Sequence, residues 1–347
     1  MERDNNFDPL RMIAAGLVLF SHSYPLYGRQ PEPLAALSGD AETWGGVAVA
    51  IFFFMSGFLL TGSLERGGGL ARYAIGRALR LLPALGGAVL VTAFAIGPLF
   101  TRLSLRAYLA SGWTWSYLGN AAVFPLQYPL PGLFEANPYA SVVNGSLWTL
   151  PVEVCMYVLL PALAAIGALR GWRATLAPAA FVVALALART ELAWGWQNRG
   201  PILLHSVPAY NFVELGVFFF VGACFRVHRR RIPADWRIAA LLAAIAVAGL
   251  HSRFSYTGLV VALPYLVYWI AMAPIPLHAI TTRIGDISYG FYLYAFPVQQ
   301  AVWQLLSGVL GFWELMATAF AATTALAWLS WRWIERPALA WKARLAG

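Results

Sequence analysis

The sequence predicts an all-α protein that crosses a membrane several times. Of its 347 residues, 60% are hydrophobic and 11% are charged, whereas soluble domains carry about a quarter charged residues. The mean hydropathy is +0.65. Several uncharged runs approach or exceed the ~20 residues that a helix needs to cross a hydrocarbon core. The clearest of these runs are 43–64, 81–101, 287–313 and 315–331.

Ten spans account for the apolar segments of the chain. The uncharged runs give the second, third, ninth and tenth spans, and the other six are apolar segments between polar or arginine-containing loops. A helix rises 1.5 Å per residue, so segments of about 16 to 26 residues suit a bilayer. The predicted spans are 8–27, 44–64, 78–100, 145–168, 173–190, 202–226, 237–252, 256–274, 284–309 and 313–334.

The stretch 107–134 is also uncharged, yet it is predicted to lie outside the membrane. Its three prolines break helices, and its clustered Trp and Tyr residues suit a membrane interface. Short cytoplasmic loops collect Lys and Arg. With ten spans, 18 of the 24 basic residues lie on the same side of the membrane as the N-terminus. An eleventh span would place everything after residue 134 on the opposite side and would leave only nine basic residues on the side of the N-terminus. The sequence therefore favours ten spans with both termini in the cytoplasm.

The basic charge of the chain reflects this topology rather than a nucleic-acid partner. The net charge is +9 and the pI is about 9.8, but the basic residues sit in short loops between spans. Cys155 and Cys224 both fall inside predicted spans, where packing is the expected role and no disulfide is expected. The expected partner of the surface is the lipid bilayer.

A histidine and an arginine share one face of the first predicted span. His22 follows Arg11 by eleven residues, which is three helical turns plus about 20°, so their side chains point the same way about 16 Å apart. Ionisable groups inside a membrane are costly and indicate a polar cavity rather than lipid contact. An imidazole can act as a general base near neutral pH. The pattern therefore predicts an active site at His22.

Glu153 interrupts the fourth predicted span at a depth comparable to that of His22. A carboxylate beside an imidazole can orient it, raise its basicity and stabilise the imidazolium. The alternative is a structural ion pair or hydrogen bond between two helices. Candidate donors for an oxyanion at this depth are Ser21, Ser23, Asn144 and Ser146.

Arg77 and Arg80 are three residues apart at the cytoplasmic edge of the third predicted span. At this spacing two guanidinium groups point the same way and can bind phosphate oxygens in bidentate fashion. Arg72 lies just upstream, and Arg11 is expected on the same side of the membrane. The general enrichment of arginine in cytoplasmic loops would also place such residues here. Their convergence predicts an anionic cytoplasmic ligand.

The remaining polar residues of the spans leave several roles open. Asp8 precedes Arg11 by about one turn and is expected to pair with it. Glu214 and Asp286 can each line the cavity or pair with a neighbouring arginine. No His, Cys or carboxylate pair has ligand spacing on one helix face, so no metal is expected.

Five blocks of sequence carry a resemblance to a known family. The chain resembles the acyltransferase-3 family of integral membrane O-acyltransferases, which are mostly bacterial, and the blocks run in order over nearly the whole chain. They are NNFDPLRMIAAGLVLFSHSYPLYG, GGVAVAIFFFMSGFLLTGS, RYAIGRALRLLPA, NGSLWTLPVEVCMYVLLP, and GDISYGFYLYAFPV followed by SWRWIERPA.

The resemblance implies a single domain over residues 1–347, with no extra soluble domain, in the bacterial inner (cytoplasmic) membrane. Such a domain moves an acyl group from cytoplasmic acyl-CoA to a sugar hydroxyl on the other face. Acetyl-CoA is the expected donor and partner. The expected acceptor is an exopolysaccharide, a lipopolysaccharide or a lipid-linked precursor. Composition predicts that the loop 28–43 and the aromatic stretch 103–143 lie outside the membrane, where their rings can stack on sugars or, as the favoured alternative, anchor the interface.

The resemblance also implies roles for individual residues. His22 matches the essential histidine of the family, and Arg11 matches its partner in the first helix. Arg77 and Arg80 match the pair assigned to the coenzyme A phosphates, and Glu153 matches the acidic residue of the Trp-x-Leu-x-x-Glu block. A further histidine is common in the block here written SYGFYLYAFPV, but this chain has Ala295 there, so no such role is expected.

Two other functions are compatible with the residues alone. A transporter of an anionic substrate would use His22 and Glu153 as a proton relay, and it predicts a repeated half with paired broken helices, which the sequence does not display. A structural or sensory subunit would use its buried polar groups for helix association alone. Within the enzyme hypothesis, His22 is expected to act as a general base on the acceptor hydroxyl rather than as a nucleophile.

Overall fold

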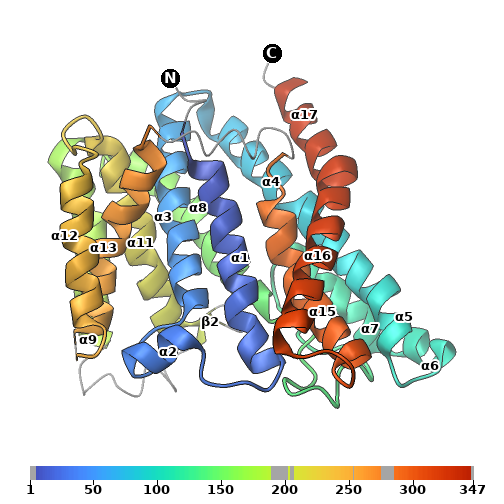
Figure 1. Ribbon diagram of the computed structural model, residues 1–347. Helices are drawn as coiled ribbons and strands as arrows, with labels where there is room; N and C mark the ends of the chain where they lie inside the picture. The colour runs from blue at the N-terminus through green and yellow to red at the C-terminus, as the bar shows by residue number, and fades with distance from the viewer. Residues whose placement is uncertain (1–4, 189–201, 204–206, 253, 275–284, 345–347) are drawn as a thin grey trace. The chain divides into compact units, whose positions relative to one another are not determined.

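The computed structural model describes residues 5–188, 202–203, 207–252, 254–274 and 285–344 (Figure 1). Almost all regular structure in these ranges is helical, which confirms the predicted all-α class. A two-residue antiparallel ladder joins Ile202–Leu203 (β1) to Val207–Pro208 (β2). The predicted spans 173–190, 202–226 and 284–309 each extend into residues outside the described ranges.

Six helical segments of the described chain are long and apolar enough to cross a membrane. They are Trp44–Glu65, Gly69–Phe100, Gly145–Ala165, Ala209–His228, Ser255–Met272 and Phe312–Trp341. Two further apolar helices, Gly171–Leu187 and Trp236–Gly249, are shorter. Helices α1 (Phe7–Leu26) and α15 (Ser288–Leu306) have 20 and 19 residues, which is long enough, but they are less apolar. The ten spans and the cytoplasmic termini remain predictions.

The chain divides into two compact units, and each is described by itself. The first unit contains Met1–Ala14, Pro33–Tyr73 and Thr149–Thr281, and the second contains Ala15–Glu32, Ala74–Trp148 and Thr282–Gly347. The boundary falls within two continuous helices, α1 and α4 (Gly69–Val91).

Glycine allows the central helices of the first unit to approach closely. The backbone of α3 (Trp44–Glu65) meets that of α11 (Ala209–His228) at Gly57 and Gly222, where an added Cβ would collide with the carbonyls of Phe219 and Phe54. Small residues at such contacts let helices in membranes pack by van der Waals contact. The other elements of this unit are α2 (Pro33–Ser38), α8 (Thr149–Ala165), η4 (Gly171–Thr175), α9 (Leu176–Ala188), α12 (Trp236–Gly249) and α13 (Ser255–Met272).

In the second unit α4 continues through a π-helical turn, η1 (Thr92–Ile96), into α5 (Gly97–Phe100). The helix begins at Gly69, earlier than the predicted start at residue 78, because arginines favour a helix as much as apolar residues do. All three candidate arginines of this region therefore lie on α4.

The aromatic stretch after α5 contains only short helices, in agreement with its predicted exclusion from the membrane. They are α6 (Leu105–Ala110), α7 (Gly112–Ser116) and the 3₁₀ turn η2 (Tyr117–Ala122), each too short to cross a bilayer. The Tyr108 hydroxyl donates a hydrogen bond of 2.8 Å to the carbonyl of Ala93. Burial raises the pKa of Tyr108 to about 12, so this hydroxyl remains a donor at neutral pH.

Helix α15 is the core helix of the second unit. It packs against α16 (Phe312–Ser330), which continues through the π-helical turn η6 (Trp331–Glu335) into α17 (Arg336–Arg344), as Figure 1 shows. The 3₁₀ turn η3 (Gly145–Trp148) also contacts α15, because Gly145 lies against the ring of Phe296.

Candidate active site

His22 lies near the carboxyl end of α1 and is partly exposed. Its Nδ1 atom is buried and has no hydrogen-bond partner. Its ring packs edge-on against Phe296 of α15, with centroids 5.3 Å apart at 75°. Arg11 is on the same continuous helix, three turns earlier, as the spacing predicts. A buried imidazole nitrogen without a partner is available to a ligand, as a general base requires.

Gln299 of α15 holds the turn of α1 that carries His22. Pro25 lies inside this part of α1 and lacks the amide hydrogen that a helix uses in its own bonding. The Gln299 Nε2 group donates to the Leu19 carbonyl at 2.9 Å and to Ser23 Oγ at 2.8 Å. Ser23 in turn donates to the Leu19 carbonyl at 2.9 Å. The turn around His22 is therefore fixed from a second helix.

The next residue, Gln300, holds the closed loop Phe134–Ser141. The Asn137 side chain donates to the Gln300 side-chain oxygen at 2.7 Å and to its carbonyl at 3.0 Å. Gln300 Nε2 donates to the carbonyls of Tyr139 and Val142 at 2.7 and 2.8 Å. A backbone hydrogen bond of 3.2 Å from the last residue of the loop to the first closes it. The two adjacent amides of α15 thus fix both the His22 turn and this loop.

Two of the candidate oxyanion donors, Asn144 and Ser23, donate their side-chain hydrogen bonds within the protein. Asn144 Nδ2 donates to the Leu293 carbonyl at 2.9 Å, and its Oδ1 accepts from the Ser146 backbone at 3.1 Å. The Tyr292 hydroxyl donates to the Ser146 carbonyl at 2.7 Å. These bonds attach the start of η3 to α15. The one hydroxyl proton of Ser23 is used on α1 itself.

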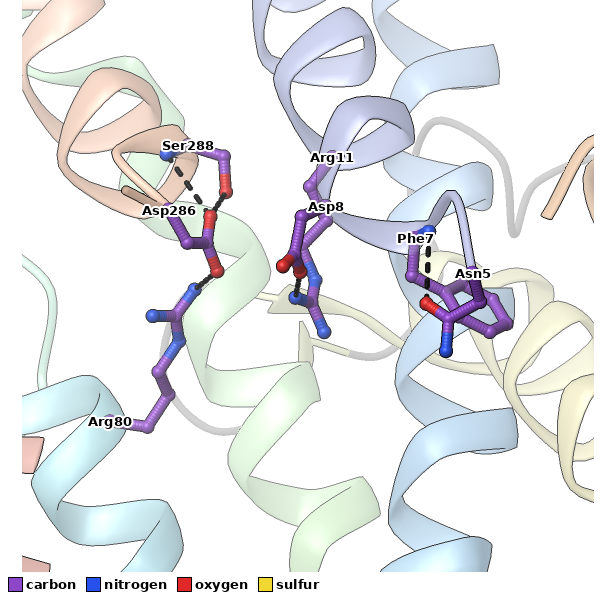
Figure 2. Close-up of polar contacts among 7 residues, drawn as sticks. All are labelled: Asn5, Phe7, Asp8, Arg11, Arg80, Asp286 and Ser288. Atoms are coloured by element: carbon purple, nitrogen blue, oxygen red, sulfur yellow. Dashed lines mark hydrogen bonds and ion pairs between the residues drawn. The ribbon is translucent and has the colours of Figure 1, made fainter. Parts of the chain in front are cut away.

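Arg80 forms an ion pair with Asp286, a residue whose role the sequence left open. The Nη2 to Oδ2 distance is 2.6 Å, and the two side chains are 21% and 14% exposed. The other Asp286 oxygen accepts from the backbone and hydroxyl of Ser288 at the start of α15 (Figure 2). The Arg80 guanidinium also lies 5.9 Å from the centre of the Tyr289 ring. These contacts fix the direction of the guanidinium.

The other predicted arginines differ in their surroundings. Arg77 is partly buried, and its Nε atom is buried with no hydrogen-bond partner. Arg72 is exposed on the first turn of α4. Arg11 pairs with Asp8 at 2.6 Å in the first unit, which confirms the predicted intrahelical pair (Figure 2).

Glu153 belongs to α8 in the first unit, where its carboxylate accepts a hydrogen bond from the Tyr157 hydroxyl one turn later. The Tyr210 hydroxyl donates to Glu214 at 3.5 Å in the same unit. His22 belongs to the second unit, so a contact between His22 and Glu153 remains a prediction.

Sequence reasoning missed several buried polar residues of the second unit, among them Gln299, Gln300 and Glu335. One Glu335 oxygen accepts from the Ser330 hydroxyl at 3.2 Å, and the other has no hydrogen-bond partner. Adjacent glutamines inside an apolar run are a signal of their own, since side-chain amides in a membrane helix must find partners. Across the described ranges, no group of three or more His, Cys, Asp or Glu residues is arranged to hold a metal ion.

Comparison with known proteins places this site in context. A family model described as an acyltransferase domain matches residues 4–332. An O-acetyl transferase from Shigella phage Sf6 is 30% identical over 97% of this chain and 96% of its own length. Nodulation protein 10 from Rhizobium leguminosarum bv. viciae is 31% identical over 96% of this chain and 93% of its own length. No solved structure matches the chain.

Proposed function

Because this chain belongs to the acyltransferase-3 family and is an O-acetyltransferase of many membrane passes, we propose that it moves an acetyl group from cytoplasmic acetyl-CoA to a sugar hydroxyl. The hydroxyl oxygen bonds to the acetyl carbon while the bond from that carbon to the coenzyme A sulfur breaks. The hydroxyl proton passes through His22 to the departing thiolate. The products are an O-acetyl sugar and coenzyme A.

The unpartnered Nδ1 atom of His22 is the observation that carries this proposal. A structural histidine in an apolar setting normally has both ring nitrogens satisfied or solvated. A general base needs a nitrogen free to take a proton, in a place from which bulk water is largely excluded. The edge-on packing against Phe296 orients the ring without using this nitrogen.

The donor site is proposed at Arg77 and Arg80, with Arg72 and Arg11 as further cations for the coenzyme A phosphates. The buried Nε atom of Arg77 without a partner supports this role, because a phosphate oxygen would satisfy it. Asp286 holds Arg80 through one nitrogen, so this cation is already oriented before a ligand arrives.

Glu153 is proposed to orient the imidazole and stabilise its charged form. In the first unit its carboxylate is bonded to Tyr157, which limits its rotation. The acetyl group is proposed to pass directly to the acceptor, with His22 as base and not as an acylated intermediate.

The acceptor is proposed to be an exopolysaccharide, a lipopolysaccharide or a lipid-linked precursor. The relative from Shigella phage Sf6 is named an O-acetyl transferase, which supports a hydroxyl as the acceptor group. We propose the bacterial inner membrane as the location, with ten spans, cytoplasmic termini and one acyltransferase domain over residues 1–347.

Calorimetric titration of acetyl-CoA into the detergent-purified protein tests the donor side. We expect the wild type to bind and an Arg77→Ala/Arg80→Ala variant to lose at least tenfold in affinity, since two charge-assisted contacts are removed. Arg230→Ala/Arg231→Ala is the matched control, because both arginines are exposed and belong to the first unit. A wild type that binds no acetyl-CoA would contradict the donor and bring the anion transporter to first place.

A further inference from the structure

Four buried polar atoms of the second unit have no hydrogen bond of ordinary geometry, and their residues contact or lie on the segment 296–300 of α15. They are His22 Nδ1, Tyr27 Oη, Asn137 Oδ1 and Gln299 Oε1. Gln299 donates two hydrogen bonds to the turn around His22, and the Tyr27 hydroxyl lies beside the Gln299 side chain. Asn137 is bonded to Gln300, the residue after Gln299. Buried polar atoms without partners are rare in folded proteins, so several of them around one segment of α15 indicate a ligand that satisfies them.

The direction of the Gln299 amide is fixed. Both protons of its nitrogen are used on α1, one at the Leu19 carbonyl and one at Ser23 Oγ. The residue is fully buried, so its oxygen cannot turn to bulk water. Its Oε1 atom is therefore a preorganised acceptor that no described protein group fills.

We propose that Gln299 and Tyr27 bind the sugar acceptor beside its reacting hydroxyl, an inference that rests on the proposed function. The reacting hydroxyl gives its proton to His22 and cannot also donate to Gln299. A second hydroxyl of the sugar donates to Gln299 Oε1, and the Tyr27 hydroxyl donates to one of the sugar oxygens. The ligand chemistry is therefore a sugar with at least two free hydroxyls, one of which is acetylated.

The loop Phe134–Ser141 offers such a ligand a route to His22. Tyr139 is 44% exposed, and its ring centre is 5.9 Å from that of Phe296. Phe296 in turn contacts the His22 ring at 5.3 Å. A sugar that rests on the exposed face of Tyr139 is thus two ring contacts from the base, and aromatic faces suit the apolar faces of sugar rings.

Initial rates of acetyl transfer from radiolabelled acetyl-CoA test the proposal. The acceptor is polysaccharide and lipid-linked oligosaccharide extracted from the cells that make the protein, treated with mild base to remove existing acetyl groups. We expect Gln299→Met to raise the apparent KM for this extract at least tenfold, because sugar hydroxyls lose a buried partner. Tyr27→Phe should raise it about threefold to tenfold. The KM for acetyl-CoA should stay unchanged in both variants.

Two controls separate binding from structure. Gln304→Met makes the same change on the exposed side of α15 and should leave both KM values unchanged. Tyr27→Phe removes one buried hydroxyl that lies beside Gln299 and keeps the ring, so it should lower the unfolding temperature little, and it decides the question alone if Gln299→Met does not fold.

Unchanged acceptor KM values in both variants would overturn this inference, and a lowered unfolding temperature in Gln299→Met would then assign Gln299 a structural role. Its failure is distinguishable from failure of the proposed function. If His22→Ala transfers acetyl at the wild-type rate, or if the wild type transfers none, the proposed function fails. If His22→Ala is inactive and both KM values are unchanged, only the inference about Gln299 and Tyr27 fails.

Discussion

The two units bury different kinds of side chain. Of the 20 polar or charged residues that are buried in the described part of the chain, 15 belong to the second unit and five to the first. The first unit is held by close helix contacts at Gly57 and Gly222, and its ion pairs from Glu65 to Arg226 and Arg229 lie at helix ends. The second unit instead buries several side-chain amides and the carboxylates of Glu32 and Glu335, and it contains the candidate base.

This difference teaches where a membrane protein keeps its chemistry. Buried polar groups in a bilayer are costly and persist where they serve a function, whereas apolar packing with small residues is sufficient for architecture. The first unit is therefore expected to respond to substitutions mainly through stability, and the second mainly through activity.

The largest effect is expected at the centre of the second unit. His22→Ala should lower acetyl transfer by about 10²- to 10⁴-fold, because the reacting hydroxyl loses its base. Transfer is measured with radiolabelled acetyl-CoA, and calorimetry checks that acetyl-CoA still binds. If a folded His22→Ala protein transferred acetyl at the wild-type rate, His22 would not be the base.

For Gly57→Leu in the first unit, the comparison predicts a loss of stability rather than a specific loss of activity. An added side chain there collides with the backbone carbonyl of Phe219, so we expect a loss of about 3 kcal/mol or more in the free energy of unfolding. Thermal unfolding in detergent is the measurement. Gly86→Leu is the control, since a Cβ on Gly86 meets no atom within 4 Å. Equal stability of the two variants would show that the α3 and α11 contact is loose.

Glu153→Gln tests an exception to this division, because Glu153 is a residue of the first unit with a proposed part in catalysis. We expect kcat to fall about tenfold to a hundredfold, since an amide cannot stabilise the imidazolium as a carboxylate does. Rates at saturating donor and acceptor measure this change. An unchanged kcat would confine the chemistry to the second unit and leave Glu153 as a partner of Tyr157.

The smallest expected effects are on stability, and they compare one ion pair from each unit. Asp286→Asn should cost about 1 to 2 kcal/mol of unfolding free energy, because the partly buried Arg80 loses its countercharge while Ser288 keeps an acceptor. Asp8→Asn removes the pair of Arg11 from an aspartate that is 53% exposed and should cost about 0.5 kcal/mol or less. Denaturant titration of both variants gives the two values, and equal losses would contradict the expected difference in burial.

Features that depend on short-range rules could be predicted from the sequence. The helical class, the lack of a long helix in the aromatic stretch and the pair of Asp8 with Arg11 all follow from hydropathy, proline and helical spacing. The continuous helix that carries both Arg11 and His22 follows in the same way.

Features that depend on tertiary contacts could not be predicted. Arg80 and Asp286 are 206 positions apart, and no local pattern pairs them. The role of Gln299 depends on the proline-containing turn of α1, which is 276 positions from it at Ser23. The sequence analysis took its main candidates from the charged residues and did not include Gln299 or Gln300, although uncharged amides are also costly to bury.

The Gly69–Phe100 helix is longer than a membrane is thick. Its 32 residues extend about 48 Å, against about 30 Å for the hydrocarbon core, so about a dozen residues stand clear of the core. With Phe100 at the opposite boundary, this overhang contains Arg72, Arg77 and Arg80. The arginines then reside among lipid headgroups, whose phosphates would compete with those of the proposed donor, acetyl-CoA. Affinity for acetyl-CoA should therefore be lower in vesicles rich in anionic lipid, and the proposed donor site would then couple the rate of acetyl transfer to the composition of the bilayer.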